Sequence, residues 1–168
     1  YYHAQAQKSK QLEDYTTAAH WYRDYLASFP DDADSAETNY LLAEALFESR
    51  QYPDAASEYE HTAYAYPDGA RSAAAGYAAL VAYQKQEELL TMAARPAWHE
   101  RATAAGVHFA ETFPDHPESA GVLTRAAQDV FAAHDLPRAI KLAEALLART
   151  PPVEAAKQRI GWTIVGQG

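Results

Sequence analysis

Three glutamates are the best candidates for acid–base chemistry in this sequence of 168 residues. Glu37, Glu44 and Glu48 are spaced by seven and four residues, which places them on one side of a predicted helix. Paired carboxylates transfer protons efficiently where a closed pocket shifts their pKa values. An open array of helices offers no such pocket. We therefore interpret the three glutamates as a solvated face or as a patterned binding surface, rather than as a catalytic pair.

Histidine and aspartate raise the question of metal binding. His99-Glu100 lacks the second histidine of a zinc-protease motif, and His99 and His108, nine residues apart on one predicted helix, face in different directions. The acidic segment 31–35 lacks the glycine and the final glutamate of a calcium loop, so we interpret it as a linker whose carboxylates cap the next helix. The sequence contains no cysteine, no Gly-rich phosphate loop and no nucleophile elbow. It predicts no catalytic residue, no metal site and no cofactor.

These candidate residues lie on predicted helical hairpins. In the segment 35–48, Leu42, Ala43 and Leu46 recur at steps of three and four, and Ala55 and Tyr59 continue the pattern after a turn at 49–51. Pro53 lies at the start of the second helix, where a missing N–H costs nothing. No segment has the alternation of a strand. The sequence therefore predicts an all-α protein.

The same hairpin recurs along the chain. The prolines that end successive units are separated by 37, 47 and 37 residues, and these are Pro30, Pro67, Pro114 and Pro151. A helix pair at such a period is typical of a solenoid. We predict one domain over 1–168, with repeats at 1–30, 31–67, 68–114 and 115–151 and a trailing helix at 152–168. The trailing helix either caps the array or begins a further repeat.

The third repeat is longer by about ten residues, which fall near 84–95. We expect the preceding helix to extend through this insert, with Leu89, Leu90 and Met92 packing on the helix that follows. The alternative is a projecting element that binds a partner.

The repeats resemble the tetratricopeptide repeat (TPR) family. The motif is carried by the run L-A-x-A-L-F, then Q-Y-x-x-A-x-x-x-Y, then Y-P, with a small residue at Ala18, Ala55, Ala102 and Ala139. Gly106 and Ala143 stand where the family has an aromatic residue. Glu13, Arg50 and His134 stand where it has a glycine between the helices. The resemblance implies a right-handed superhelix of antiparallel helix hairpins.

Aromatic-Pro-Asp at the ends of the first three repeats makes the chain most similar to the envelope TPR proteins of Gram-negative bacteria, of the BamD and YbgF (CpoB) types. The resemblance implies a non-enzymatic scaffold for protein–protein interaction in outer-membrane or cell-wall assembly, periplasmic or outer-membrane associated. Three alternatives remain: a TPR arm of a polysaccharide secretion apparatus, a cytoplasmic regulatory or chaperone module, and an accessory domain of an enzyme.

In the TPR family the first helix of each hairpin lines a concave groove. The resemblance maps this groove onto Glu37, Tyr40, Glu44, Phe47, Glu48, Tyr77, Val81, Gln84, Lys85, Thr124, Gln128 and Phe131, with Ala74 beside Tyr77 and with His3, Gln7, Lys10 and Gln11 on the first helix. The aromatic rings would anchor a protein or peptide partner, or would pack between neighbouring helices. The basic clamp of chaperone-binding TPRs is missing, and the glutamates would favour a cationic or amide-rich partner.

The charge of the chain limits its partners. It has 14 basic and 23 acidic residues, a formal net charge of −9, and no basic cluster of the kind that binds nucleic acid or an anionic membrane surface. No apolar run approaches the roughly 20 residues that a membrane span requires. The sequence starts within a helical pattern, at Tyr1-Tyr2, so we expect it to be part of a longer protein.

Overall fold

The computed structural model describes residues 1–30, 32–66, 69–149 and 152–167. In this part of the chain there are helices and no strands, which confirms the all-α prediction. The helices are α1 (Tyr2–Ser9), α2 (Leu12–Ser28), α3 (Ser35–Glu48), α4 (Tyr52–Tyr64), α5 (Ser72–Leu89), α6 (Arg95–Thr112), α7 (Ser119–Ala132), α8 (Leu136–Leu147) and α9 (Ala155–Val165). The predicted repeat ends at Pro67 and Pro151 lie outside the described residues.

The helices form two compact units, residues 1–98 and 99–168, with the boundary inside α6. The first unit holds α1 to α5 and the first residues of α6. The second holds the rest of α6 and α7 to α9. The single solenoid domain over 1–168 remains a prediction.

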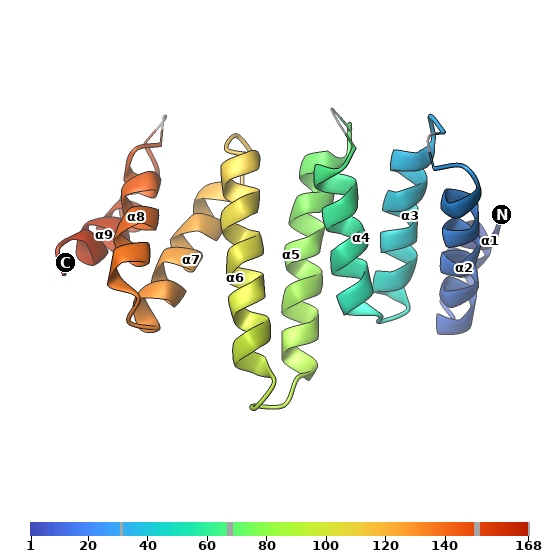
Figure 1. The fold of residues 1–168 in the computed structure, drawn as a ribbon, viewed down its shortest axis with the longest axis horizontal. Helices are drawn as coiled ribbons and strands as arrows, with labels where there is room; N and C mark the ends of the chain where they lie inside the picture. The colour runs from blue at the N-terminus through green and yellow to red at the C-terminus, as the bar shows by residue number, and fades with distance from the viewer. Residues whose placement is uncertain (31, 67–68, 150–151, 168) are drawn as a thin grey trace. The chain divides into compact units, whose positions relative to one another are not determined.

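In the first unit each helix packs against the next one in the chain. Figure 1 shows α2, α3, α4 and α5 side by side, in the order of the sequence. The buried residues of these helices include the small residues Ala18 and Ala55. Leu42 and Leu46 on α3 are buried as well. Alanine allows two helix backbones to approach closely, so the small positions identified in the sequence lie where the helices meet.

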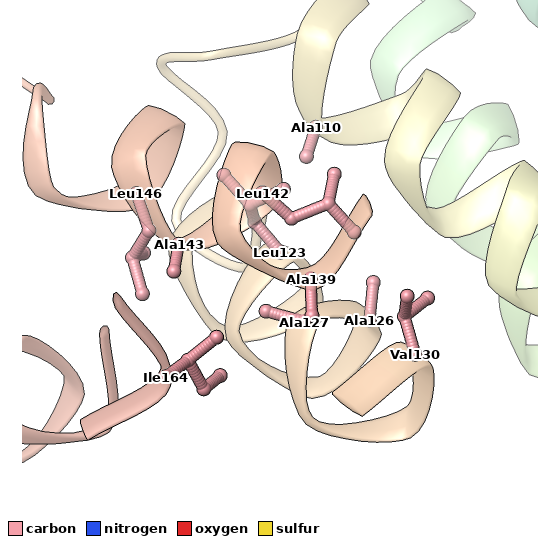
Figure 2. Packing of buried hydrophobic residues seen from close by; sticks show 10 residues of the cluster. All are labelled: Ala110, Leu123, Ala126, Ala127, Val130, Ala139, Leu142, Ala143, Leu146 and Ile164. Atoms are coloured by element: carbon pink, nitrogen blue, oxygen red, sulfur yellow. The ribbon is translucent and has the colours of Figure 1, made fainter. Parts of the chain in front are cut away.

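The second unit has its own apolar core, formed by the end of α6 and by α7, α8 and α9, the last three of which each pack against the other two. Figure 2 shows this core, which consists of Ala110, Leu123, Ala126, Ala127, Val130, Ala139, Leu142, Ala143, Leu146 and Ile164. Ile164 comes from the trailing helix and is buried, whereas Trp162 is 63% exposed. Helix α9 therefore covers the preceding hairpin with one face and leaves its tryptophan on the surface.

The turns within the hairpins share one left-handed residue. Lys10, Arg50 and His134 have φ values of 58°, 63° and 62°. After α3 the N–H of Arg50 bonds to the Phe47 carbonyl and the N–H of Gln51 to the Leu46 carbonyl, both at 2.9 Å, and the turn after α7 repeats these bonds. This is the Schellman arrangement, in which glycine is usual. Arg50 and His134, which stand where the TPR family has a glycine, thus adopt the left-handed backbone conformation expected at that position. The position predicted at Glu13 is wrong, because Lys10 makes that turn.

The turns between hairpins share a serine. The N–H of Ser35, Ser72 and Ser119 bonds to the carbonyl three residues earlier, at 3.0 Å each time. The hydroxyls of Ser35 and Ser119 also donate to the carbonyls of Phe29 and Phe113, at 3.0 and 2.5 Å. These serines are buried at the first position of α3, α5 and α7.

The carboxylate cap predicted before α3 is wrong for Asp34, whose side chain makes no capping bond. Asp32 instead accepts the N–H of Asp34 at 2.9 Å, within the turn. The turn is closed by the Ser35 hydroxyl, which donates to the Phe29 carbonyl and does not cap the helix N–H groups.

Helix α5 extends into the insert but ends at Leu89, so the expected extension through 84–95 is confirmed only for its first part. The predicted packing of Leu89 and Met92 is wrong, since they are 67% and 86% exposed. The contact with the start of α6 is made by Trp98 instead, whose indole N–H donates to the Tyr83 carbonyl at 2.8 Å. The apolar residues of the insert therefore lie at an exposed hairpin tip.

Candidate interaction face on the first unit

The residues that the sequence singled out on α3 share one surface, which we call the α3 face: Glu37, Tyr40, Glu44, Phe47 and Glu48. Glu44 is half-buried and accepts a hydrogen bond from the Tyr59 hydroxyl of α4. Burial and the bond to Glu44 both raise the pKa of Tyr59, burial having the larger effect. The phenol therefore stays protonated and holds the Glu44 carboxylate in place.

Glu37 is joined to the residue that directly precedes α5, the first helix of the next hairpin. The Arg71 guanidinium, just before α5, bonds to both Glu37 oxygens, with Nη2 2.8 Å from Oε1. The Arg71 guanidinium also lies 4.6 Å above the centre of the Tyr40 ring. The bond to Glu37 raises the pKa of Arg71. This arrangement combines a two-pronged ion pair with a cation–π contact.

The aromatic rings of the α3 face pack on the second helix of the same hairpin. Tyr40 lies 5.8 Å from Tyr59, and Phe47 lies 5.2 Å from Tyr52 and 6.5 Å from Tyr59, between ring centres. Tyr40 and Phe47 remain half-exposed. The sequence left open whether these rings anchor a partner or pack between the first helices of adjacent hairpins. The structure shows a third arrangement, in which both rings pack against α4 and Arg71 additionally covers the Tyr40 ring.

His3 of α1 adds an unpaired polar atom beside this face. Desolvation lowers the pKa of His3, and the nearby Glu44 and Glu48 partly oppose that shift. Its Nδ1 is buried and has no hydrogen-bond partner among the described residues. His3 packs edge-on against Tyr15 and lies next to Tyr22, with ring centres 6.4 and 5.9 Å apart. Neutral imidazole therefore lies close to the two carboxylates.

The other predicted groove residues of the first unit lie on α5. Tyr77, Val81 and Lys85 are half-buried and Gln84 is exposed. Lys85 forms an ion pair with Glu88 at 3.1 Å, on its own helix.

The groove residues predicted on α7 belong to the second unit. Gln128 is exposed and Phe131 is half-buried against the apolar core. The prediction of Thr124 as a surface residue is wrong. It is 6% exposed, and its hydroxyl donates to the Ala120 carbonyl of its own helix at 2.7 Å.

His99 and His108, the histidines considered for metal binding, lie in different places along α6. His99 lies 3.5 Å from the Asp129 carboxylate on α7, and His108 is exposed further along α6. No group of three or more metal-ligating side chains occurs among the described residues.

An open depression of about 420 Å³ lies in the second unit, between the turn before α7 and the start of α9. Arg149 and Lys157 line it together with Asp115 and Glu154, and Lys157 is paired with Glu154 at 3.1 Å. The balanced charges give this depression no clear preference for a ligand.

Two residues next to the α3 face, Arg71 and Asn39, were not predicted from the sequence. Arg71 was not considered, although it directly precedes a predicted helix one repeat after Glu37. Asn39 was not considered either. It is buried between α3 and α4, where it donates to Glu58 at 2.6 Å and accepts from Thr62 at 2.8 Å. A polar residue within an apolar stripe was the signal for this network.

Comparison with known proteins gives no relative from which a role could be transferred. No family model matches the sequence, and no curated protein matches it. Among the described helices, none combines the length and the apolar character that crossing a membrane requires.

Proposed function

We propose that this chain is a non-enzymatic scaffold that binds a protein or peptide partner through the α3 face. The observation that carries the proposal is the pairing of half-exposed rings, Tyr40 and Phe47, with carboxylates on one helix. Helix α4 supports these side chains from behind, so little conformational entropy is lost when a partner binds. Rigid aromatic anchors surrounded by polar groups are typical of binding surfaces.

The partners of the carboxylates favour binding over catalysis. Glu37 is neutralised by Arg71 and Glu44 is held by the Tyr59 hydroxyl. A general acid or base needs a pKa near the working pH and a proton to exchange with a bound substrate. Carboxylates fixed on an open helix face are better suited to recognising a partner's positive or N–H groups.

The proposal includes the finer architecture that the TPR resemblance implies. Small residues at the helix contacts and equivalent turns after α3 and α7 support a right-handed superhelix of hairpins.

The aromatic-Pro-Asp ends of the repeats support a place in the bacterial cell envelope, in outer-membrane or cell-wall assembly. Fractionation of cells that express the full gene should recover the protein with the envelope. Recovery in the cytoplasm alone would contradict that location.

Partner capture tests the binding face. Glu48 is exposed at the edge of the α3 face, so Glu48→Arg should abolish capture of specific partners without affecting the fold. Glu144→Arg, at an exposed position of α8 in the second unit, is the matched control and should retain them. Captured proteins are compared by mass spectrometry, and circular dichroism verifies the helix content of both variants. Identical sets of proteins from the two variants would contradict the assignment of the α3 face.

A further inference from the structure

The negative charge of the chain is concentrated in one unit. Residues 1–98 contain 7 basic and 15 acidic side chains, a formal net charge of −8, whereas residues 99–168 contain 7 and 8, a net charge of −1. A field of this kind attracts cationic partners and repels anionic ones. A partner of the α3 face is therefore expected to be basic.

The first unit already binds one guanidinium on the α3 face. Arg71 lies over the Tyr40 ring while both of its prongs reach the Glu37 carboxylate. Carboxylate and ring lie three residues apart on α3, at the start of the helix. The chain itself thus shows which chemical group this combination of side chains accepts.

The same combination recurs two turns further along α3, without a cation. Glu44 and Glu48 flank Phe47 on the α3 face, and no ion pair joins either carboxylate to a basic side chain among the described residues. The Tyr59 hydroxyl orients Glu44 from behind. These residues also lie at the C-terminal end of α3, where the helix dipole favours a positive charge.

Glu44 and Glu48 also act electrostatically on His3 of α1: burial lowers the pKa of His3, and the two carboxylates partly oppose that effect. A bound group with several N–H donors would satisfy both carboxylates at once. Lysine offers a compact charge, whereas the planar fork of arginine can bridge two acceptors and stack on a ring at the same time.

We propose that Glu44, Glu48 and the Phe47 ring bind an arginine side chain of a basic partner segment. The inference rests on the proposed function, because it names the chemistry of the partner at the same face. Arginine binds here in the manner of Arg71, with its guanidinium between carboxylates and against a ring.

Two matched peptides test the inference on the whole chain. One carries three arginines separated by glycines, with both ends blocked, and the other carries lysines at the same places. Because the net charges are equal, attraction to the charge of the first unit is the same for both. We expect the arginine peptide to bind roughly threefold or more tightly, because only a guanidinium can bridge both carboxylates while it stacks on the ring. In amide NMR spectra of the chain the arginine peptide should shift the signals of Phe47 and Glu48.

Three variants complete the test. Glu48→Gln removes a carboxylate with no partner among the described residues, and Phe47→Leu keeps an apolar side chain but removes the ring. Both should bring arginine and lysine peptides to equal affinity, and Glu144→Gln in the second unit should leave the preference unchanged. Equal binding of the two peptides by the unaltered chain would overturn the inference, as would an arginine preference that survives Glu48→Gln. If that happens while Glu48→Arg still abolishes partner capture, the scaffold proposal stands and only the arginine inference fails.

Discussion

A buried serine hydroxyl closes the turn before α3 and the turn before α7. In both, the acceptor is the carbonyl of an aromatic residue six positions earlier, Phe29 or Phe113. The equivalent hydroxyl of Ser72 has no partner among the described residues. The serine at the start of the first helix of a hairpin thus makes this hydrogen bond in two hairpins, at Ser35 and Ser119, and does not make it at Ser72.

This difference predicts unequal effects of one substitution. Ser35→Ala should lower the free energy of unfolding by about 1 kcal/mol, because it removes a buried hydrogen bond and leaves a carbonyl unpaired. Ser72→Ala should have a smaller effect or a stabilising one, because the hydroxyl it removes is already unsatisfied. Urea unfolding followed by circular dichroism measures both. Equal losses in the two variants would show that the hydrogen bond to Phe29 contributes nothing.

Tyrosine burial predicts how stability depends on alkaline pH. Desolvation is the main cause that raises the pKa values of Tyr22, Tyr40, Tyr59 and Tyr64 above their ordinary value of 10.0 in the folded chain. Below pH 10 these phenols are neutral in both states, so their contribution to stability is complete. Above pH 10 the unfolded chain ionises more readily, and stability should fall as the pH rises. Urea unfolding between pH 8 and pH 11 measures the loss.

Absorbance at 295 nm provides the control, since it reports tyrosinate directly. Part of the tyrosinate absorbance should appear only when the chain unfolds, because the buried phenols stay protonated in the folded state. Tyr59→Phe should make the loss of stability with rising pH less steep. An unfolding midpoint that stays constant through this range would contradict the account.

At the scale of elements, the hairpin turns place non-glycine residues in a left-handed conformation. Arg50 and His134 occupy the C′ position of a Schellman turn after α3 and α7. Left-handed backbone costs an ordinary residue roughly 1–2 kcal/mol, part of which is offset because glycine loses more entropy on folding. The helices end there because the pair of backbone bonds satisfies their last carbonyls.

Glycine at these turns should therefore stabilise the chain. We expect Arg50→Gly and His134→Gly each to raise the free energy of unfolding by about 0.5–1 kcal/mol. Ser57→Gly is the matched control, since Ser57 is exposed in the interior of α4, and it should lower stability by up to about 1 kcal/mol. Thermal unfolding of the three variants provides the comparison. If Arg50→Gly destabilises as much as the control does, the turn geometry is not the one described.

At the scale of the whole molecule, the chain builds two cores of different composition. Both cores contain many alanines. The first unit combines them with Leu42, Leu46 and buried tyrosines such as Tyr59, whereas the cluster of the second combines them with Leu123, Val130, Leu142, Leu146 and Ile164. The net charge also differs between the units, since the first is strongly acidic and the second is nearly neutral.

Because the two units have separate cores, we expect a substitution in one core to destabilise mainly the unit that contains it. Leu146→Ala should destabilise the second unit by about 2–5 kcal/mol, because it leaves a cavity in a fully buried site. Hydrogen exchange measured by mass spectrometry should then accelerate in α7 to α9 more than in α2 to α5. Leu46→Ala should show the opposite pattern. Uniform acceleration along the chain in both variants would show a single cooperative unit instead.

Individual residues show how far the sequence could predict this structure. Leu42, Leu46, Ala55 and Tyr59 are buried where their spacing places them, because a helical period decides which side chains can face a neighbour. Thr124 was misplaced, because its exposure depends on how α7 packs with α8 and α9. Leu89 and Met92 were misplaced for a similar reason. Apolar side chains stay exposed when no neighbouring helix reaches them, and no local pattern reveals that.

The sequence by itself determined the helices, the turns after α3 and α7, and the acidic net charge of the chain. These properties depend on local spacing, on proline and on composition, each of which acts within a few residues. Only the tertiary structure decided which carboxylate received which partner. Arg71 reaches Glu37 from 34 positions away, and Tyr59 reaches Glu44 from the next helix, because the packing of α3, α4 and α5 brings these side chains within hydrogen-bond distance.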